Sequence, residues 1–484
     1  MSAASRLRAA GLLLACMMLF LPAEGRTTET GTSPSADSLA GDPFAGDESF
    51  STLFAAKQPE QEPDDKIQLQ NDLHGYLESR DRFRVDDSKW ISTRQRLWLE
   101  MDSVFRRHAA PGAGQLYSVF ISGAVDLEPA AADLSGDNDP ARIYIEEAFL
   151  TIDQAQWDLI VGQKTLRTGT GDGINPMDLV NPLDHRDPVA NGRSDSRLPI
   201  PLAFASLQLP RYGGVQEACI EAVFIPLAGV NRMNASGSAW ESPGVAALRR
   251  GAAAGEFVLE KQEEPNQYFE QAEYSLRLAA TFSGWDVGLI GFAGYKDSPV
   301  FSTGSVQIQG KEKLALTPVH PGFSAMGLTF AKGFERSTLR GELAWKPDLP
   351  LTASSLDYAS GFLRRSVNEG VIGIDRTLGV NLYTNVQYFF ICTDDAELTV
   401  NDSFDHGITY EVNDTFFNDD LKSGVRGIVS FSGEGWTFEA YAQYQRFDNW
   451  LISLSLLFYE GPEDGSYGAY DANDALTLRL RYSF

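Results

Sequence analysis

The chain ends Leu476-Thr477-Leu478-Arg479-Leu480-Arg481-Tyr482-Ser483-Phe484, a stretch in which apolar and polar residues alternate without a break. Such alternation is typical of a β-strand, because successive side chains point to opposite faces. The strand has one apolar and one polar face, and the terminal aromatic residue lies on the apolar one. An ordinary edge strand of a soluble protein is one interpretation. The pattern favours the other, a transmembrane β-barrel whose last strand pairs with the first and faces lipid.

The same ending resembles the C-terminal signature of outer-membrane proteins, which has a final aromatic residue and apolar residues at every second position before it. The resemblance implies residence in the outer membrane of a Gram-negative bacterium. It also implies that the barrel-insertion machinery reads the apolar residues Leu476, Leu478, Leu480, Tyr482 and Phe484.

The N-terminus has the organisation of a secretory signal peptide. Arg6 and Arg8 precede an apolar run over residues 9–21, and small residues follow it up to Gly25. We expect residues 1–25 to be a signal peptide that is cleaved near Gly25. The run is too short to span a bilayer as a helix.

Residues 26–66 differ in composition from the rest of the chain. They contain nine acidic residues, three basic residues and four prolines, with many Ser, Thr and Gly. Such a composition buries too little apolar surface to order itself, so we predict a disordered periplasmic segment. Phe44, Phe50 and Phe54 leave open a role in docking a partner or plugging the lumen.

Residues 67–484 are predicted to form the barrel. Alternating segments recur throughout this region; in one, Trp436, Phe438 and Ala440 oppose Thr437 and Glu439. We predict an all-β, antiparallel transmembrane barrel of about 18 strands, with 16 as the alternative, because such barrels have an even number of strands. The even count requires a strand through residues 408–412.

A C-terminus in the periplasm assigns the connections to two ends of the barrel, with short periplasmic turns and long external loops. We expect the short turns near residues 153–156, 211–214, 283–284, 332–337, 375–379 and 446–449. We expect the long loops near residues 128–141, 167–198, 228–269, 297–320, 347–367 and 460–472.

Charged residues on the inward faces are the candidates for lining the pore. The alternation predicts that the first and last strands bring their arginines to one wall beside the second strand, and that another strand adds acidic side chains. The candidate pore-lining residues are Arg80, Arg94, Arg96, Glu100, Glu217, Glu221, Arg479 and Arg481. Opposed basic and acidic walls would orient charged solutes. Alternatively, these charges pair with each other and link neighbouring strands.

The loop at 167–198 contains two Asn-Pro-x-Asp units, each of which favours a stiff turn. A long loop of stiff turns is unusual unless it is functional. It would either fold into the lumen as a constriction or remain a compact external loop. The candidate constriction residues are Asn175, Asp178, Asn181, Asp184, His185, Arg186 and Asp187. Their spacing matches no metal-binding loop, so we predict no metal and no cofactor.

The segment Leu159-Ile160-Val161-Gly162-Gln163-Lys164, followed by Asn175-Pro176-x-Asp178, resembles a family of outer-membrane porin-like proteins that is defined by a domain of unknown function. The alginate-export porin family has a similar strand. In the first family a strand ending in Gly-Arg-Gln precedes the Asn-Pro-x-Asp loop, whereas this chain has Gly162-Gln163-Lys164. The resemblance implies a barrel of this type.

The predicted function is passive, partly selective diffusion of small polar or charged solutes through an outer-membrane channel. The alternative is export or uptake of a larger polysaccharide or a hydrophobic compound with periplasmic partners. The chain has five histidines and no Gly-x-Ser-x-Gly, so we predict that it is not an enzyme. The net charge of −26 argues against nucleic acid as a partner. The expected partners are outer-membrane lipid, lipopolysaccharide, the insertion machinery and a small solute.

Overall fold

The computed structural model describes residues 68–107, 115–128, 141–169, 171, 174–186, 196–234, 236–355 and 360–484. The predictions for the signal peptide (1–25), for the acidic segment (26–66) and for Asp187 lie outside the described residues.

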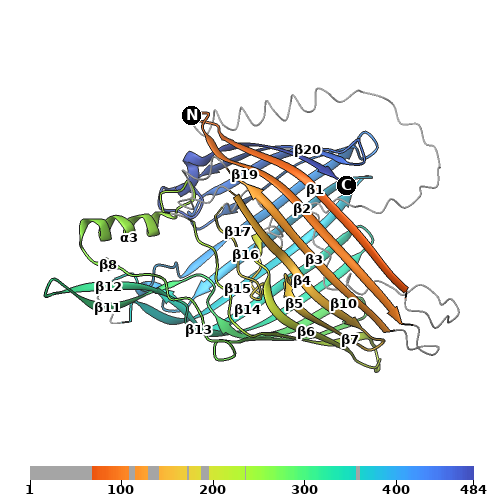
Figure 1. Ribbon diagram of the computed structural model, residues 1–484, viewed down its shortest axis with the longest axis horizontal. Helices are drawn as coiled ribbons and strands as arrows, with labels where there is room; N and C mark the ends of the chain where they lie inside the picture. The colour runs from red at the N-terminus through yellow and green to blue at the C-terminus, as the bar shows by residue number, and fades with distance from the viewer. Residues whose placement is uncertain are drawn as a thin grey trace.

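Eighteen antiparallel strands form one closed barrel, as predicted (Figure 1). Each strand pairs with the next one along the chain, and β1 pairs with β21 to close the wall. The first nine wall strands are β1 (Gln68–Arg84), β2 (Trp90–Arg107), β3 (Gln115–Leu127), β4 (Ala141–Asp153), β5 (Trp157–Lys164), β6 (Ile200–Gln208), β7 (Val215–Ile225), β9 (Glu273–Phe282) and β10 (Trp285–Tyr295). The other nine are β13 (Gly322–Phe334), β14 (Ser337–Thr352), β15 (Phe362–Leu378), β16 (Leu382–Thr393), β17 (Phe404–Phe416), β18 (Leu421–Ser430), β19 (Trp436–Tyr444), β20 (Trp450–Glu460) and β21 (Ala475–Ser483).

The seam between β1 and β21 fixes which residues of the two chain ends meet. Glu78 lies opposite Arg481, and Arg80 lies opposite Arg479. The terminal residue closes the ladder, because Gly75 and Phe484 exchange two backbone hydrogen bonds of 3.0 and 2.9 Å. The last strand therefore joins the first through residues that are about 400 positions apart in sequence.

The two faces of the wall differ as the alternation predicts. On β13 the outward Met326 is 63% exposed, whereas the preceding Ala325 is 1% exposed. Other outward apolar side chains that remain exposed include Leu77, Leu99, Leu278, Leu289, Leu343, Ile372 and Leu480. The outer surface is thus an apolar belt, and the polar residues between these positions point into the barrel.

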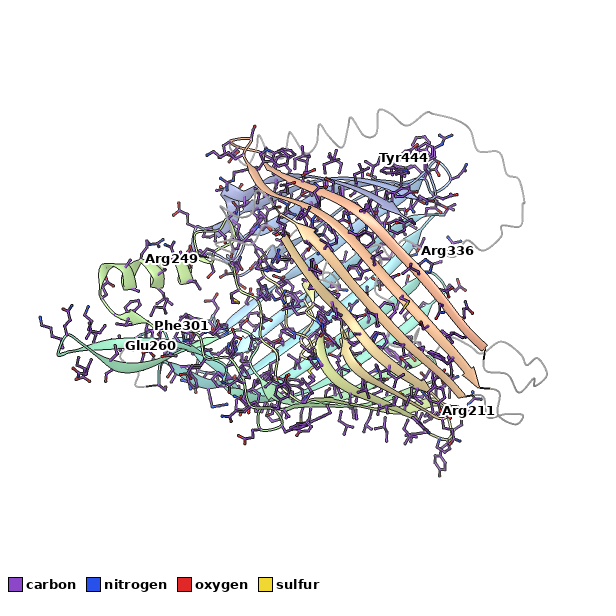
Figure 2. All side chains as sticks on the ribbon, viewed as in Figure 1. Arg211, Arg249, Glu260, Phe301, Arg336 and Tyr444 are labelled. Atoms are coloured by element: carbon purple, nitrogen blue, oxygen red, sulfur yellow. The ribbon has the colours of Figure 1, made fainter. Side chains whose placement is uncertain are left out.

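The connections have the predicted asymmetry. Arg211, Arg336 and Tyr444 mark the end of the barrel with the short turns, and Arg249, Glu260 and Phe301 mark the end with the long loops (Figure 2). The strand that the even count required is present as β17. The loop expected at 347–367 is shorter, because β14 continues to Thr352 and β15 begins at Phe362. A register shift between Lys346 and Leu349 places Pro347 in an irregularity that needs no ladder hydrogen bond.

Ile91 is a second difference from the expected pattern. The alternation of β2 assigns Ile91 to the outer apolar face, yet the side chain is buried with Leu457, Tyr459 and Ala475. The register between β1 and β2 shifts at Arg82/Phe83, so that Ile91 is left out of the pairing. An irregularity of this kind reorients a side chain locally.

The long loops carry structure that the sequence pattern did not indicate. The strands β8 (Val258–Leu259), β11 (Val300–Ile308) and β12 (Lys311–Val319) form a separate small sheet. The helix α3 (Pro243–Ala254) precedes it, and the short helices η3 (Ala396–Leu398) and η4 (Gly468–Asn473) lie in later loops. Ser242 caps α3 by accepting from the Val245 N–H at 3.4 Å. In the described part of the chain, no helix is both long enough and apolar enough to cross a membrane.

We predict that deletion of Phe484 lowers the fraction of folded barrel. The deletion removes two backbone hydrogen bonds at the seam, each worth about 0.5–1.5 kcal/mol, and also the ring that lies against Gly75. The folded fraction is measured by electrophoresis of unheated samples, as the intensity of the compact, heat-modifiable band. Phe447→Ala, which removes an exposed ring from a short turn, is the control. Equal folded fractions for both variants would contradict the prediction.

Candidate functional site

A group of arginines surrounds one carboxylate on the inner wall at the seam. The side chain of Glu78 is fully buried, and its oxygens accept from Arg94 at 3.0 Å, Arg479 at 2.7 Å and Arg481 at 2.8 Å. We call the following residues of β1, β2 and β21 the seam cluster: Glu78, Arg80, Arg82, Arg94, Arg479 and Arg481. It brings together four of the candidate pore-lining residues, Arg80, Arg94, Arg479 and Arg481.

A second charged group lies beside the seam cluster on β2, β3 and β4. Arg96 donates to both carboxylate oxygens of Asp126, at 2.7 and 2.8 Å. Tyr144 donates to the same carboxylate at 2.9 Å. Glu100, farther along the inner face of β2, accepts from the Trp98 indole at 3.2 Å. The bidentate geometry makes Arg96 a rigid link between two strands.

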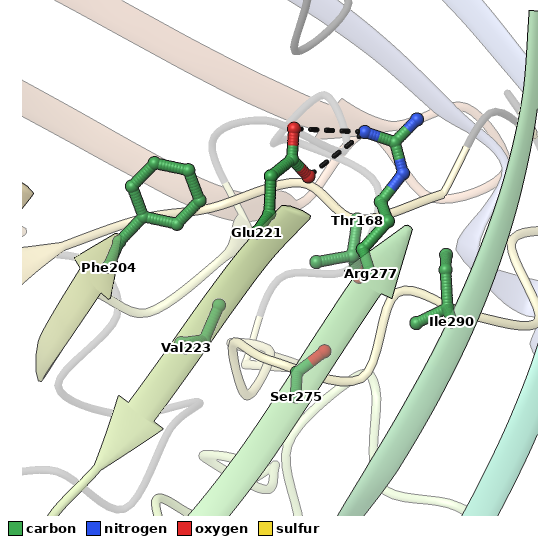
Figure 3. Close-up of a pocket in the computed structure, with 7 residues that line it drawn as sticks. All are labelled: Thr168, Phe204, Glu221, Val223, Ser275, Arg277 and Ile290. Atoms are coloured by element: carbon green, nitrogen blue, oxygen red, sulfur yellow. Dashed lines mark hydrogen bonds and ion pairs between the residues drawn. The ribbon is translucent and has the colours of Figure 1, made fainter. Parts of the chain in front are cut away.

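The predicted acidic positions lie on β7. Glu221 is buried and pairs with Arg277 of β9 at 3.0 Å, whereas Glu217 is exposed near the short-turn end. The pair borders a small pocket whose walls also include Phe204, Val223 and Ile290 (Figure 3). Three more inward pairs link adjacent strands, namely Arg340–Asp375, Lys346–Glu369 and Arg426–Glu439. Each of these charges thus has an opposite charge on a neighbouring strand.

The loop between β5 and β6 folds into the barrel. We call its described residues within 165–199 the lumen loop. Leu166 and Val180 are buried in a cluster with Leu202, Phe204 and Val223, which are inward residues of β6 and β7. At its far end, Met177 is buried in a cluster formed by residues of β10, β13 and β14: Ile290, Phe292, Ala325 and Ala344. Because these residues lie on the face opposite the exposed apolar belt, the loop crosses the lumen.

Glu342 holds the far end of the lumen loop. This β14 side chain is completely buried, and its carboxylate accepts from the backbone N–H of Met177. With its amide nitrogen turned toward the carboxylate, Asn175 donates to both oxygens, at 2.9 and 3.2 Å. Gly327 is required beside this contact, because a Cβ there would collide with Met177.

Two further candidate residues link parts of the lumen loop to one another. The Asn181 side chain accepts from the Leu166 N–H at 2.6 Å and donates to the Leu198 carbonyl at 2.8 Å, so that it ties the two ends of the loop together. Asp178 pairs with Arg197 at 2.6 Å, and both side chains are buried. These contacts make the loop a fixed element of the lumen.

The remaining described candidates lie where three long loops meet. Asp184 pairs with Arg186 at 2.6 Å, and the His185 ring lies 3.3 Å from the Asn231 side chain. Burial lowers the pKa of His185 below its ordinary value. Asn231 accepts from the Leu183 N–H at 2.6 Å.

Asn231 also joins a third loop to this meeting point. Its backbone N–H donates to the carbonyl of Asp297 at 3.0 Å, and its side chain donates to Ser298 at 2.9 Å. We call Asn231 the loop hub, because it connects the lumen loop, the β7–β9 loop and the segment after β10.

Sequence reasoning missed four residues that organise this site: Arg277, Glu342, Asn231 and Trp240, the last of which is buried against the Tyr459 ring at the rim of the barrel. The first two lie on inward positions of alternating strands, so the period-two pattern could have identified them. Asn231 and Trp240 lie in irregular segments, where no periodic signal marks the residue that makes a long-range contact.

No family model and no curated protein matches the sequence. Similar solved structures include OmpF of Salmonella typhi in complex with daunomycin, at 10% identity and a TM-score of 0.41, covering 86% of this chain and 97% of that chain. OccK5 (OpdH) of Pseudomonas aeruginosa gives 10% identity, a TM-score of 0.45 and coverage of 86% and 97%. OccAB3 of Acinetobacter baumannii gives 9% identity, a TM-score of 0.45 and coverage of 86% and 99%.

We predict that Glu342→Gln loosens the far end of the lumen loop. Replacing a charged acceptor in this buried contact costs about 2 kcal/mol, which raises the undocked population roughly 30-fold. Hydrogen–deuterium exchange of a peptide containing the Met177 amide should accelerate accordingly. Glu439→Gln, which alters an inward carboxylate paired with Arg426, is the matched control. Unchanged protection of Met177 in Glu342→Gln would show that the carboxylate is not the anchor.

A second prediction concerns Asp297 beside the loop hub. Burial raises the pKa of Asp297 from 3.8 to about 7, Lys296 opposes the shift and Asp178 adds to it. A raised carboxyl pKa means that the native state binds more protons than the unfolded state between these values, so this contribution to stability falls as pH rises from about 4 to 7. Asp297→Asn should lack that decline. We expect its advantage over the wild type in thermal unfolding to grow from pH 4 to pH 8; parallel profiles would refute the prediction.

Proposed function

We propose that this chain is an outer-membrane channel that permits passive, partly selective diffusion of small polar or charged solutes. The observation that carries the proposal is a closed barrel whose inner wall is lined by charges and narrowed by the lumen loop. A barrel of this number of strands is wide enough for an aqueous path.

The apolar belt supports the membrane location. Outward leucines and isoleucines remain exposed on strands around the wall, and a soluble protein would have to leave this surface in water. A closed barrel satisfies its backbone hydrogen bonds internally, which is the requirement for crossing lipid with strands. We place the short turns in the periplasm and the long loops outside, near lipopolysaccharide. Leu476, Leu478, Leu480, Tyr482 and Phe484 would be read by the insertion machinery.

The seam cluster supports a preference for anions. Its five arginines and one glutamate concentrate positive charge on one section of the wall, and the low-dielectric surroundings extend the reach of that field. The lumen loop narrows the remaining path, so a solute must pass close to the charged wall. We therefore assign selectivity to these two elements together, and we propose no enzymatic step.

We predict that neutralising two arginines of the seam cluster together with the neighbouring Arg96 reduces anion selectivity. The triple substitution Arg94→Gln/Arg96→Gln/Arg479→Gln should shift the reversal potential in a KCl gradient toward cation preference, measured on purified protein in planar bilayers. Arg336→Gln, which removes one positive charge at a short turn outside the lumen, should leave the reversal potential unchanged.

Two outcomes would count against the proposal. Protein that inserts and shows heat-modifiable folding but never conducts would overturn the channel and favour export or uptake of a larger compound with periplasmic partners. A conducting triple variant with the wild-type reversal potential would overturn the role of the arginines. Because the triple variant leaves Glu78 and Asp126 with fewer partners, Arg481→Gln alone provides a milder test in which Arg94 and Arg479 still contact Glu78.

A further inference from the structure

The β7–β9 loop sends a segment across the mouth of the barrel. We call residues 226–234 and 236–242 the strap. It begins after Ile225 at the end of β7 and passes through the loop hub. It then reaches the inner rim at the seam, where its Trp240 is buried in one cluster with residues of β2, β20 and β21. Five strands, β2 to β6, separate β7 from β1 in the wall, so the strap spans the mouth as a chord.

The far end of the strap is held by one aromatic side chain. Trp240 is 4% exposed, and its ring lies 6.0 Å from the ring of Tyr459 and 5.7 Å from that of Tyr470. Its other apolar neighbours, Leu457 and Ala475, are inward residues of β20 and β21. The adjacent Ala239 carbonyl accepts from the Asn473 side chain at 2.5 Å. The strap is thus held by tilted aromatic rings and one hydrogen bond, which join two distant parts of the chain.

The buried Trp240 ring lies next to the seam cluster, on the side nearest the long loops. The guanidinium carbon of Arg82 is 5.9 Å from the centre of the Trp240 ring, and Arg82 also donates to Thr477 of β21 at 3.1 Å. A solute that enters from the long-loop end and moves along the arginine wall would therefore meet Trp240 first. After Ser242 the chain continues as α3, which lies at this same end of the barrel (Figure 1).

The two ends of the strap are fixed by different means. The loop hub holds one end through hydrogen bonds to backbone and side-chain groups of two other loops. The other end depends mainly on the rings around Trp240, which lack a strict directional requirement. Release of Trp240 would therefore free the strap at the seam while the hub continues to hold it.

We propose that the strap is a gate over the seam cluster and that the seating of Trp240 against β20 and β21 holds it closed. The inference rests on the proposed channel function. It explains why an irregular segment carries a buried tryptophan from β7 to β21, which six strands, β1 to β6, separate from it in the wall. It also assigns the gate to the arginine-lined part of the path and leaves the lumen loop as a fixed constriction.

Trp240→Ala tests the gate by planar-bilayer recording of the full-length protein. We expect a larger mean conductance and the loss of low-conductance states. Trp90→Ala is the matched control, because Trp90 lies near the same rim but is 49% exposed and packs against the Phe83 ring. A silent wild type with a conducting Trp240→Ala variant would support both the gate and the channel. A conducting wild type that Trp240→Ala leaves unchanged would overturn the gate alone, and silence of all three proteins would overturn the channel.

A reversible lock tests the same proposal without removing the aromatic side chain. The Asn473 side chain reaches the Ala239 backbone, so we place an engineered disulfide at this contact with Ala239→Cys/Asn473→Cys, in a background with Cys219→Ser/Cys392→Ser. The oxidised channel should remain in its low-conductance state, and dithiothreitol should restore openings within the same recording. Openings that occur equally before and after reduction would overturn the gate.

Discussion

Closure of the wall is the constraint on which the rest of the structure depends. A strand with unpaired N–H and C=O groups cannot face lipid, so the last strand must pair with the first. The register of that pairing places Arg479 and Arg481 beside Arg80 and Glu78, although the two ends of the chain are remote in sequence. The seam cluster is therefore a direct product of closure, and the selectivity that we propose for the channel follows from the same hydrogen-bond ladder.

Charges that closure turns inward are costly unless each finds a partner in the low-dielectric wall. The wall meets this requirement with pairs on neighbouring strands, such as Arg96 with Asp126 and Arg277 with Glu221. The two readings of the inward charges are thus compatible. In the channel that we propose, the same arginines that link the strands would also set the electrostatic potential of the lumen, because an ion pair cancels charge at long range only when the charges are balanced. Around Glu78 several arginines share a single carboxylate.

Two loops, the lumen loop and the strap, extend from this wall into or across the barrel. Glu342 and Asn181 fix the lumen loop at its two ends, which gives the path a rigid narrow section. The strap has one hydrogen-bonded end at Asn231 and one aromatic end at Trp240, so its two attachments differ in character. The fixed constriction and the gate that we propose would therefore be built from loops that start on nearby strands and meet at Asn231.

The sequence by itself predicted about 18 strands, with 16 as the alternative, and it predicted the short turns at one end of the barrel and the long loops at the other. It predicted the inward side chains of the strands except where a bulge intervenes, because alternation is a property of the local sequence. It also identified Arg94, Arg479 and the Asn-Pro-x-Asp loop as candidates. Only the tertiary structure decided that this loop enters the lumen, that Glu342 receives it and that Trp240 reaches the seam. Those contacts join irregular segments to distant strands, and no periodic pattern encodes the partner of a residue outside a strand. The bulge that turns Ile91 inward belongs to the same class, because it arises from how two strands fit together.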